Sequence, residues 1–494
     1  MSDFDAVVIG GGPGGATAAT LVAKDGHRVL LLEKERFPRY QIGESLLPST
    51  VHGVAPLLGV AEELTKAGFP LKRGGTFRWG TNPEPWTFTF ALSRRLAESS
   101  STAYQVERQR FDTILLDNAR RCGVEVREKH EAVALLRDGD RVTGVRFREA
   151  TGRESEARAP YVVVAAGNTS RLHKGIGVRE LSPFFRNMAL FGYFEGGKRL
   201  PPPNEGNILC AAFEVGWFWY IPLSDTLTSV GAVVARERAG DIQKDPEAAM
   251  LTYIKACPLI ATYLADATRV PEGMYSPLRV RKDYSYANSV FWSPGVALVG
   301  DAACFVDPVF STGVHLATYG GLLAARSINS RLRGELSDDA VFGEFERRYR
   351  REYNLFYEFL QSMYDMNRSD SSYFWEARRL LGAGVSGEVA FAELVAGVSG
   401  DGGETIAKLG PASPAAHDLS GALSRASQQD ALDEGDIVLT GPDTRMLGEA
   451  LREATELQVR AGLREHADLL PPSKPLVPGG LTATTDGLRW LVPS

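Results

Sequence analysis

The hydrophobic pattern at the N-terminus predicts a strand, a helix and a second strand in quick succession. Residues 4–9 (FDAVVI) form a short apolar run that leads directly into the glycine-rich sequence GGGPGG at 10–15. The alanine-rich segment 16–24 has the composition of a helix, and the run RVLLLE at 28–33 reads as a buried strand that ends in a carboxylate. This order of elements is a βαβ unit with a glycine loop after its first strand.

The glycine loop of this unit is predicted to bind the diphosphate of a dinucleotide. Gly10 permits a tight turn, Gly12 lets the backbone approach the phosphates, and Gly15 allows the helix to pack closely on the strand. The free N–H groups at the helix N-terminus attract phosphate, and Glu33 is placed to accept a hydrogen bond from a ribose hydroxyl. The motif does not distinguish NAD from FAD.

Farther along, the pattern changes from strands to helices. The run 161–167 (YVVVAAG) resembles a strand that returns to the nucleotide-binding sheet, and 228–234 (TSVGAVV) is typical of an antiparallel sheet between 75 and 235. From about 338 to 382 aromatic residues recur at helical spacing. Those aromatic side chains form either core or a cover over an aromatic substrate. A further amphipathic helix is predicted at 445–467.

Composition narrows the class of protein. The chain has 494 residues and a net charge of −6, and it lacks the basic tract that a nucleic-acid-binding protein would need. It has neither an apolar run of membrane-spanning length nor a signal peptide, so we expect a cytoplasmic protein without a membrane partner. The four cysteines lie far apart without a C-x-x-C pair, which argues against disulfides and against a metal site.

Motifs outside the glycine loop favour FAD. Arg39 precedes the sequence IGES, which ends in Glu44 and Ser45; Arg108 lies in QVERQRFD, and Asp301 lies in a Gly-Asp pair. These motifs occur in the same order in flavoprotein monooxygenases of the p-hydroxybenzoate hydroxylase type, which the chain resembles. The resemblance implies that Arg108 lies near the flavin chain and that Asp301 binds the ribityl hydroxyls. No second G-x-G-x-x-G follows a strand, so a dedicated NAD(P)H domain is not evident.

Three further segments point to a smaller group of flavoproteins. They are FPLKRG at 69–74, which contains Lys72; WFWYIP at 217–222, which contains Trp217 and Trp219; and FVDPVFSTG at 305–313. Together with the glycine loop, these segments resemble the motif set of flavin-dependent halogenases. The similarity extends through most of residues 3–380. It is greatest to halogenases that act on phenolic or pyrrolic acyl groups tethered to acyl or peptidyl carrier proteins.

The resemblance implies a chemistry. A separate flavin reductase supplies FADH₂, which reacts with O₂ to a flavin C4a-hydroperoxide; chloride attacks it and yields hypohalous acid. Trp217 and Trp219 are then a barrier that keeps substrate from the flavin, and both indoles should line the space between the flavin pocket and Lys72. Lys72 binds the hypohalous acid or forms a chloramine.

In the same resemblance, Pro308 and Gly313 contact the cofactor, and the backbone N–H groups of Thr312 and Gly313 hold the halide. A catalytic carboxylate cannot be placed from the sequence. Glu346 lies in the charged stretch EFERRYRR and is predicted to face solvent.

The expected fold class is α/β: a Rossmann-like FAD-binding domain of the p-hydroxybenzoate hydroxylase type, interleaved with an antiparallel-sheet substrate domain, plus a mainly helical C-terminal region. The predicted parts are FAD-binding segments at about 1–75, 100–170 and 280–335, a substrate-side sheet at about 76–99 and 171–280, a helical cover at 336–380 and a C-terminal extension at 381–494.

The function predicted from these features is chlorination of a phenolic, tyrosyl-derived group in secondary-metabolite (antibiotic) biosynthesis. Two alternatives stay open. One is an aromatic hydroxylase that reduces its own FAD with NAD(P)H, and the other is a flavoprotein without catalytic activity.

Overall fold

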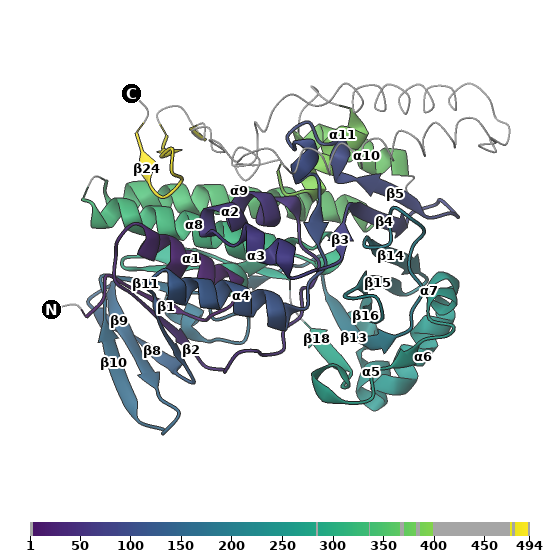
Figure 1. Cartoon of the computed structure of the whole chain (residues 1–494), viewed down its shortest axis with the longest axis horizontal. Helices are drawn as coiled ribbons and strands as arrows, with labels where there is room; N and C mark the ends of the chain where they lie inside the picture. The colour runs from purple at the N-terminus through teal and green to yellow at the C-terminus, as the bar shows by residue number, and fades with distance from the viewer. Residues whose placement is uncertain are drawn as a thin grey trace.

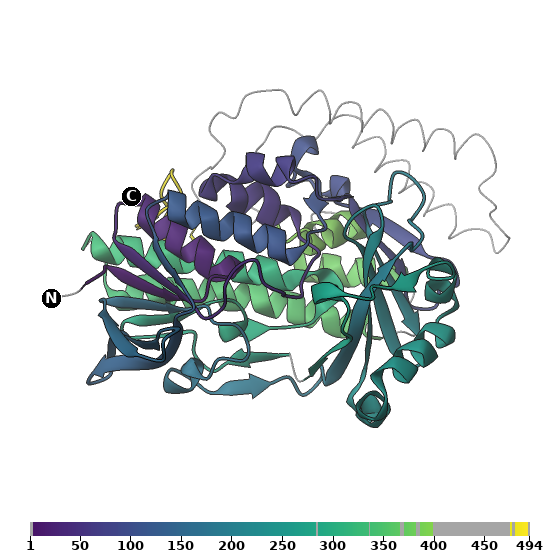
Figure 2. The same ribbon diagram turned by 60° about the horizontal axis from the view of Figure 1, so that its bottom comes forward.

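The computed structural model describes residues 3–282, 285–334, 336–365, 370–381, 386–398, 475–476 and 480–492. Two large sheets stand at opposite ends of this part of the molecule, and long helices run between them (Figures 1 and 2). The first sheet has six strands in the order β20-β21-β11-β1-β2-β7. The second has eight: seven follow the order β17-β13-β16-β15-β14-β4-β5, and β18 pairs with β13.

The six-stranded sheet contains the predicted βαβ unit. Its strands are β1 (Ala6–Ile9), β2 (Val29–Glu33), β7 (Glu125–Glu128), β11 (Tyr161–Val164), β20 (Trp292–Ser293) and β21 (Val296–Leu298). All its pairings are parallel except β20 with β21. Helix α1 (Pro13–Lys24) connects β1 to β2, and every residue of β1, β2 and β11 is buried. Uniform burial explains why these strands are continuous apolar runs rather than alternating ones.

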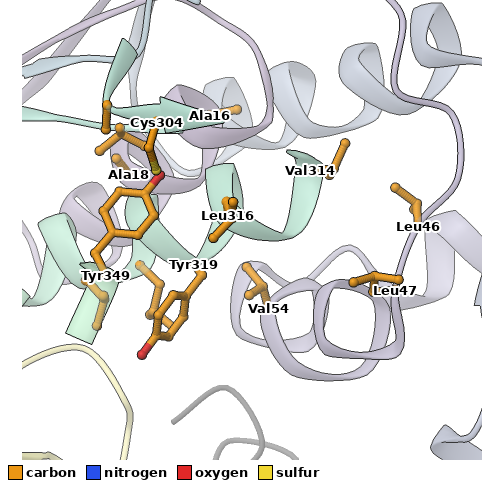
Figure 3. Close-up of a cluster of buried hydrophobic side chains, with 14 of the residues drawn as sticks. Ala16, Ala18, Leu46, Leu47, Val54, Cys304, Val314, Leu316, Tyr319 and Tyr349 are labelled. Carbon is orange, nitrogen blue, oxygen red and sulfur yellow. The ribbon is translucent and has the colours of Figure 1, made fainter. Parts of the chain in front are cut away.

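Helices α1 and α8 (Thr312–Leu332) form the centre of the core next to this sheet. They approach closely because glycines face each other: a Cβ on Gly14 would lie 2.9 Å from the Ala317 carbonyl oxygen, and one on Gly321 would lie 2.5 Å from that of Gly14. Side chains from both helices and from the segment that contains Leu46, Leu47 and Val54 pack into one apolar cluster (Figure 3).

The second sheet is mixed. Its members are β4 (Gly74–Arg78), β5 (Trp86–Thr89), β13 (Asn187–Glu195), β14 (Ile208–Phe213), β15 (Gly216–Pro222), β16 (Leu227–Ala235), β17 (Thr268–Arg269) and β18 (Arg279–Lys282). All are antiparallel neighbours except β4 and β14, which pair in parallel. One face packs against the main core, and the other packs on α5 (Ala239–Lys244), α6 (Pro246–Ala256) and α7 (Pro258–Tyr263).

Helices complete the fold. The long α9 (Asp338–Met363) lies against α8, while α10 (Asp370–Leu381) and α11 (Gly387–Val395) lie beside β4 and β5 in Figure 1. The remaining elements are α2 (Ala55–Leu58), α3 (Ala61–Lys66), α4 (Arg108–Arg121), β3 (Leu71–Lys72), β6 (Ala103–Tyr104), β8 (Glu131–Asp138), β9 (Arg141–Arg148), β10 (Glu154–Arg158), β12 (Arg179–Leu181), β19 (Tyr286–Asn288), β22 (Cys304–Phe305), β23 (Thr482–Ala483) and β24 (Trp490–Leu491).

The predicted α/β class is confirmed, with one difference in detail. The substrate-side sheet is not purely antiparallel, because β4 and β14 run in the same direction. A separate three-stranded antiparallel sheet, β10-β9-β8, precedes β11, so the strand at 161–164 returns to the six-stranded sheet after an antiparallel excursion. The C-terminal region is helical in α9, α10 and α11, whereas the predicted helix at 445–467 lies outside the described residues. The domain boundaries stay predictions.

Candidate active site

The glycine loop has the geometry that its sequence predicts. Gly10 has φ +100°, which only glycine adopts readily, and a Cβ there would collide with the Ala165 carbonyl. A Cβ on Gly15 would collide with the Gly10 carbonyl, so this glycine sets the close helix–strand contact. The Gly11 N–H donates to Glu33 Oε2 at 2.7 Å, and the Glu35 N–H donates to Oε1 at 2.8 Å. Glu33 therefore supports the loop as well as lining the cavity beside it.

A cavity of about 780 Å³ extends from this loop to the face of the mixed sheet. Eleven of the predicted residues line it: Gly10, Gly12, Glu33, Arg39, Glu44, Ser45, Arg108, Trp219, Asp301, Pro308 and Gly313. Its glycine loop, helix N-termini and buried carboxylates suit an elongated dinucleotide with a diphosphate and several hydroxyls. FAD fits this set of residues. Gly15, Lys72, Trp217 and Thr312 are not among the residues that line the cavity.

Two arginines at the cavity are held by one buried carboxylate. Arg108 binds Asp112 through two hydrogen bonds, of 2.7 and 2.9 Å, and Arg39 Nη1 donates to the same carboxylate at 3.0 Å. Arg108 also donates to the Ile42 carbonyl at 2.5 Å, which fixes the segment before Glu44. Because one carboxylate is shared by two guanidinium groups, this end of the cavity keeps a positive charge that favours an anionic cofactor.

Asp301 lies opposite these arginines. Burial raises the pKa of its carboxyl, and Arg108 and Arg179 partly oppose the shift. Tyr286, which sequence reasoning missed, also lines the cavity and donates to the Asp301 carbonyl oxygen at 2.6 Å. The Arg179 guanidinium covers the Tyr286 ring at 4.1 Å from its centroid. The Tyr286 hydrogen bond fixes the Asp301 backbone at the cavity wall.

Glu44 is the second buried carboxyl at the cavity. Burial raises its pKa to about 7, although the Tyr193 hydroxyl donates to Oε1 at 2.7 Å and favours the charged form. The Tyr40 and Tyr193 hydroxyls are 2.8 Å apart, so hydrogen bonds connect Glu44 to Tyr40 at the cavity wall. Sequence reasoning missed Tyr193 because it lies in β13, far along the chain from Glu44, and belongs to no recognisable motif.

The two tryptophans occupy different positions relative to the cavity, and the expectation that both indoles line the space between the flavin pocket and Lys72 stays a prediction. Trp219 lines it, with Nε1 donating to Ser229 Oγ at 3.2 Å. Its indole lies over Gly231, where a Cβ would overlap the ring. Trp217 is only 1% exposed and lies behind Trp219, with ring centroids 6.2 Å apart, in contact with Trp79. The alternation of the strand places both indoles on one face, but only Trp219 reaches the cavity.

Lys72 is buried beside the cavity rather than in it. Its side chain is 2% exposed, and Nζ donates to the Leu46 carbonyl at 3.0 Å and to Ser311 Oγ at 3.5 Å. Nζ also lies 5.5 Å from the centroid of the Phe90 ring. Burial lowers the pKa of Lys72 to about 7. Since Ser311 lines the cavity, a single residue lies between the lysine and the cavity at this point.

The segment after Asp301 leads into helix α8. Ser311 has a left-handed backbone (φ +61°, ψ 28°) that turns the chain so that α8 begins at Thr312. Thr312 is fully buried, and its hydroxyl points to the Asp307 carbonyl at 3.5 Å. A Cβ on Gly313 would lie 2.8 Å from the Phe305 ring. The start of this 21-residue helix therefore faces the cavity at Gly313.

Two buried polar clusters near α8 were not predicted. The first joins Asp307 to Tyr364 and Trp217. The second joins Ser49 Oγ to His315 Nδ1 at 2.8 Å and His315 Nε2 to Glu352 at 2.8 Å. Each combines residues from segments far apart in the chain, so neither forms a recognisable motif.

The prediction that Glu346 faces solvent is not met. Its side chain is 18% exposed, accepts the Phe291 N–H at 3.1 Å and pairs with Arg350, because the charged stretch packs against the β19–β20 connection. Across the described residues, no cluster of His, Cys, Asp or Glu is arranged to hold a metal ion. The same residues include no helix that is long and apolar enough to cross a membrane.

The glycine-loop sheet, the mixed sheet and the elongated cavity between them define an FAD-binding oxidoreductase. The chain belongs to the tryptophan halogenase family, whose model matches residues 5–101 and 93–384, and it is a flavin-dependent halogenase. The structure of the myxobacterial chondrochloren halogenase, described as a new variant of FAD-dependent halogenases, shares 50% identity over 99% of each chain with a TM-score of 0.75.

Two curated relatives come from other bacteria. Tryptophan 2-halogenase of Chondromyces crocatus is 35% identical over 379 residues, 76% of this chain and 70% of the relative. The 1H-pyrrole-2-carbonyl-[peptidyl-carrier protein] chlorinase of Pseudomonas fluorescens is 30% identical over 387 residues, 74% of this chain and 84% of the relative.

Proposed function

We propose that the protein uses FADH₂ from a separate reductase, O₂ and chloride to chlorinate a phenolic, tyrosyl-derived acyl group on a carrier protein, in the biosynthesis of a secondary metabolite. The observation that supports this most directly is the buried Lys72, whose Nζ donates to Ser311 Oγ at the wall of a cavity that Trp219 also lines. A Pseudomonas relative whose name specifies a peptidyl-carrier-bound substrate supports the tethered form of the substrate.

Different residues around the cavity bind the cofactor, bind the chloride and exclude the substrate. Gly10, Gly12, Glu33, Arg108 and Asp301 hold the cofactor, and reduced FAD with O₂ supplies the oxidant that converts chloride to hypochlorous acid. The free backbone N–H groups at Thr312 and Gly313, with the helix dipole behind them, bind the chloride. The Trp219 indole forms part of the cavity wall and keeps the ring of an organic substrate out of the cavity.

Lys72, beside Ser311 in the cavity wall, is the group that would receive the hypochlorous acid. A buried ammonium donates strong hydrogen bonds, and with a pKa of about 7 both its charged and its neutral form are accessible at physiological pH. The charged form polarises the hydroxide that leaves hypochlorous acid, and the neutral amine accepts chlorine as a chloramine. Whether held as hypochlorous acid or as a chloramine, the reactive chlorine is then at Lys72, which Ser311 separates from the cavity.

The test is mass spectrometry of assays in which a flavin reductase supplies FADH₂. The substrates are a carrier-bound tyrosyl thioester and free tyrosine, each with chloride and O₂. We expect a chlorinated carrier-bound product, with little or none from the free amino acid. A hydroxylated product from NADPH and the purified protein alone would overturn the halogenase proposal in favour of an aromatic hydroxylase. Chlorination of free tyrosine only would overturn carrier tethering.

A further inference from the structure

The Tyr364 hydroxyl lies in a built polar site. It donates to Asp307 Oδ2 at 2.8 Å, and it accepts hydrogen bonds from Trp217 Nε1 at 2.8 Å and from Asn187 Nδ2 at 3.2 Å. Asp307 and Trp217 are 0% and 1% exposed, respectively. One carboxylate that accepts and two N–H groups that donate satisfy a phenolic oxygen completely. Three segments of the fold converge on this single oxygen.

Aromatic rings surround the phenol ring itself. The Phe185 and Trp79 rings meet it edge to face, with centroids 5.2 and 6.2 Å away. Phe184 also contacts it, at 6.3 Å, and is 48% exposed. Edge-to-face rings around a polar centre suit any phenol of this size. The cluster therefore continues from the buried carboxylate of Asp307 out to the surface at Phe184.

The site lies on the Lys72 side of the tryptophan wall. Asp307 immediately precedes the 308–313 segment that borders the cavity, and its Oδ1 accepts the Val309 N–H of that segment at 3.1 Å. Cys210, which pairs with Trp219 across β14 and β15, contacts the Val309 carbonyl at 3.9 Å. The charges of both Lys72 and Asp307 reach the Cys210 thiol. Trp217 separates this site from Trp219 and hence from the cavity.

Tyr364 is also placed to move. It caps the C-terminal end of α9, where its backbone N–H donates to the Leu360 carbonyl at 3.1 Å. Its side chain is only partly buried, whereas Asp307 and Trp217 are fully buried. Helix ends open locally at lower free energy than helix interiors. Displacing this ring requires the last turn of α9 to unwind and the hydrogen bonds of the Tyr364 hydroxyl to break.

We propose that the pocket filled by Tyr364 is the enzyme's phenol-binding site, in which a substrate phenol takes the place of the Tyr364 ring and donates its hydroxyl to Asp307. This inference rests on the proposed function and names the group that orients its substrate. It assigns Trp217 to substrate binding, with Trp219 alone as the wall of the flavin cavity.

The chemistry balances with Asp307 as acceptor. As the phenolic proton shifts toward Asp307, electron density rises at the ring carbon next to the hydroxyl. That carbon forms a bond to chlorine while the chlorine–oxygen bond of hypochlorous acid breaks. The proton on the same carbon leaves with the released hydroxide as water, and the phenolic proton returns from Asp307. The sum is one C–H and one HOCl converted to one C–Cl and one H₂O.

The test uses p-cresol, the ring of a tyrosyl group, as a probe of the full-length FAD-loaded enzyme. Tyr364→Ala opens a phenol-sized hole beside Asp307, whereas Tyr357→Ala opens one in the same aromatic cluster, where the hydroxyl contacts Ser182 instead. We expect p-cresol to raise the melting temperature of Tyr364→Ala well above the rise given by toluene. The Tyr357→Ala variant should favour p-cresol much less, because its hole offers the neutral Ser182 hydroxyl in place of a buried carboxylate.

Two further variants complete the design. Tyr364→Phe keeps the ring and should bind p-cresol about tenfold more tightly than wild type, because displacing a ring without its hydroxyl breaks fewer hydrogen bonds. Adding Asp307→Asn to Tyr364→Ala should reduce the preference for p-cresol over toluene, because the acceptor loses its charge while Trp217 and Asn187 keep their N–H donors. Equal binding of both probes by Tyr364→Ala, or no gain in Tyr364→Phe, would overturn the inference. These readouts need no halogenation, so a failure of the proposed function would be seen separately.

Discussion

The burial of Lys72 has a measurable effect on stability. Its pKa falls from 10.5 to about 7 in the folded protein. At about 1.4 kcal/mol per pKa unit, keeping the ammonium in this site weakens the fold by roughly 5 kcal/mol at pH 7. Lys72→Met replaces it with an apolar side chain of similar length but leaves the Leu46 carbonyl without its donor, a loss of about 2 kcal/mol. We therefore expect Lys72→Met to be more stable than wild type by about 3 kcal/mol at pH 7.

The sign of the pH dependence follows from the lowered pKa. Between about pH 7 and 10.5 the unfolded chain keeps the Lys72 proton and the folded protein releases it, so wild-type stability rises with pH. The advantage of Lys72→Met should shrink by about 1.4 kcal/mol per pH unit and vanish near pH 9. Urea unfolding at pH 7, 8 and 9 measures this, with Lys66→Met, at an exposed lysine, as a control that should show no such trend. A variant less stable than wild type at pH 7, or a difference that stays constant with pH, would refute the reasoning.

Three other changes have distinct expected results. Glu33→Ala removes the acceptor of the Gly11 N–H and should weaken FAD binding at least tenfold in a fluorescence titration; unchanged affinity would contradict the assigned role. Trp219→Ala opens the cavity wall and should yield some hydroxylated product by mass spectrometry, whereas Phe218→Ala, on the opposite face of the strand, should not. Trp490→Ala removes a fully buried ring whose Nε1 donates to Ser327 Oγ and should lower stability by about 3–5 kcal/mol in urea unfolding, with FAD affinity intact. A loss below about 1 kcal/mol would contradict the expected cost of removing a buried ring.

Local sequence predicted the nucleotide-binding half of the fold well. Contiguous short-range patterns encode it: the strand 6–9, the glycine loop and the helix that follows are neighbours in the chain, and each glycine has a steric reason to be there. The motif residues Arg39, Arg108 and Asp301 line one cavity, and their roles toward FAD stay predictions.

The mixed sheet was harder to predict, because its strand pairings join residues that are far apart in the sequence. The parallel contact of β4 with β14 joins residues more than a hundred positions apart, and no local pattern reveals its direction. The depth of Trp217 behind Trp219 depends on Gly231, Trp79 and Tyr364 from other segments. A period-two pattern gives the face of a strand but not the distance along it to a cavity edge.

The measurement that tests the central claim most directly is a single turnover of Lys72→Ala with pre-reduced FAD, O₂, chloride and the carrier-bound tyrosyl substrate. Flavin absorbance follows reoxidation, mass spectrometry follows the product, and a thiol scavenger traps free hypochlorous acid. We predict wild-type FAD affinity and reoxidation, trapped hypochlorous acid and no chlorinated substrate. Chlorinated substrate in wild-type yield, or loss of FAD binding, would contradict the account by showing that Lys72 is dispensable or purely structural.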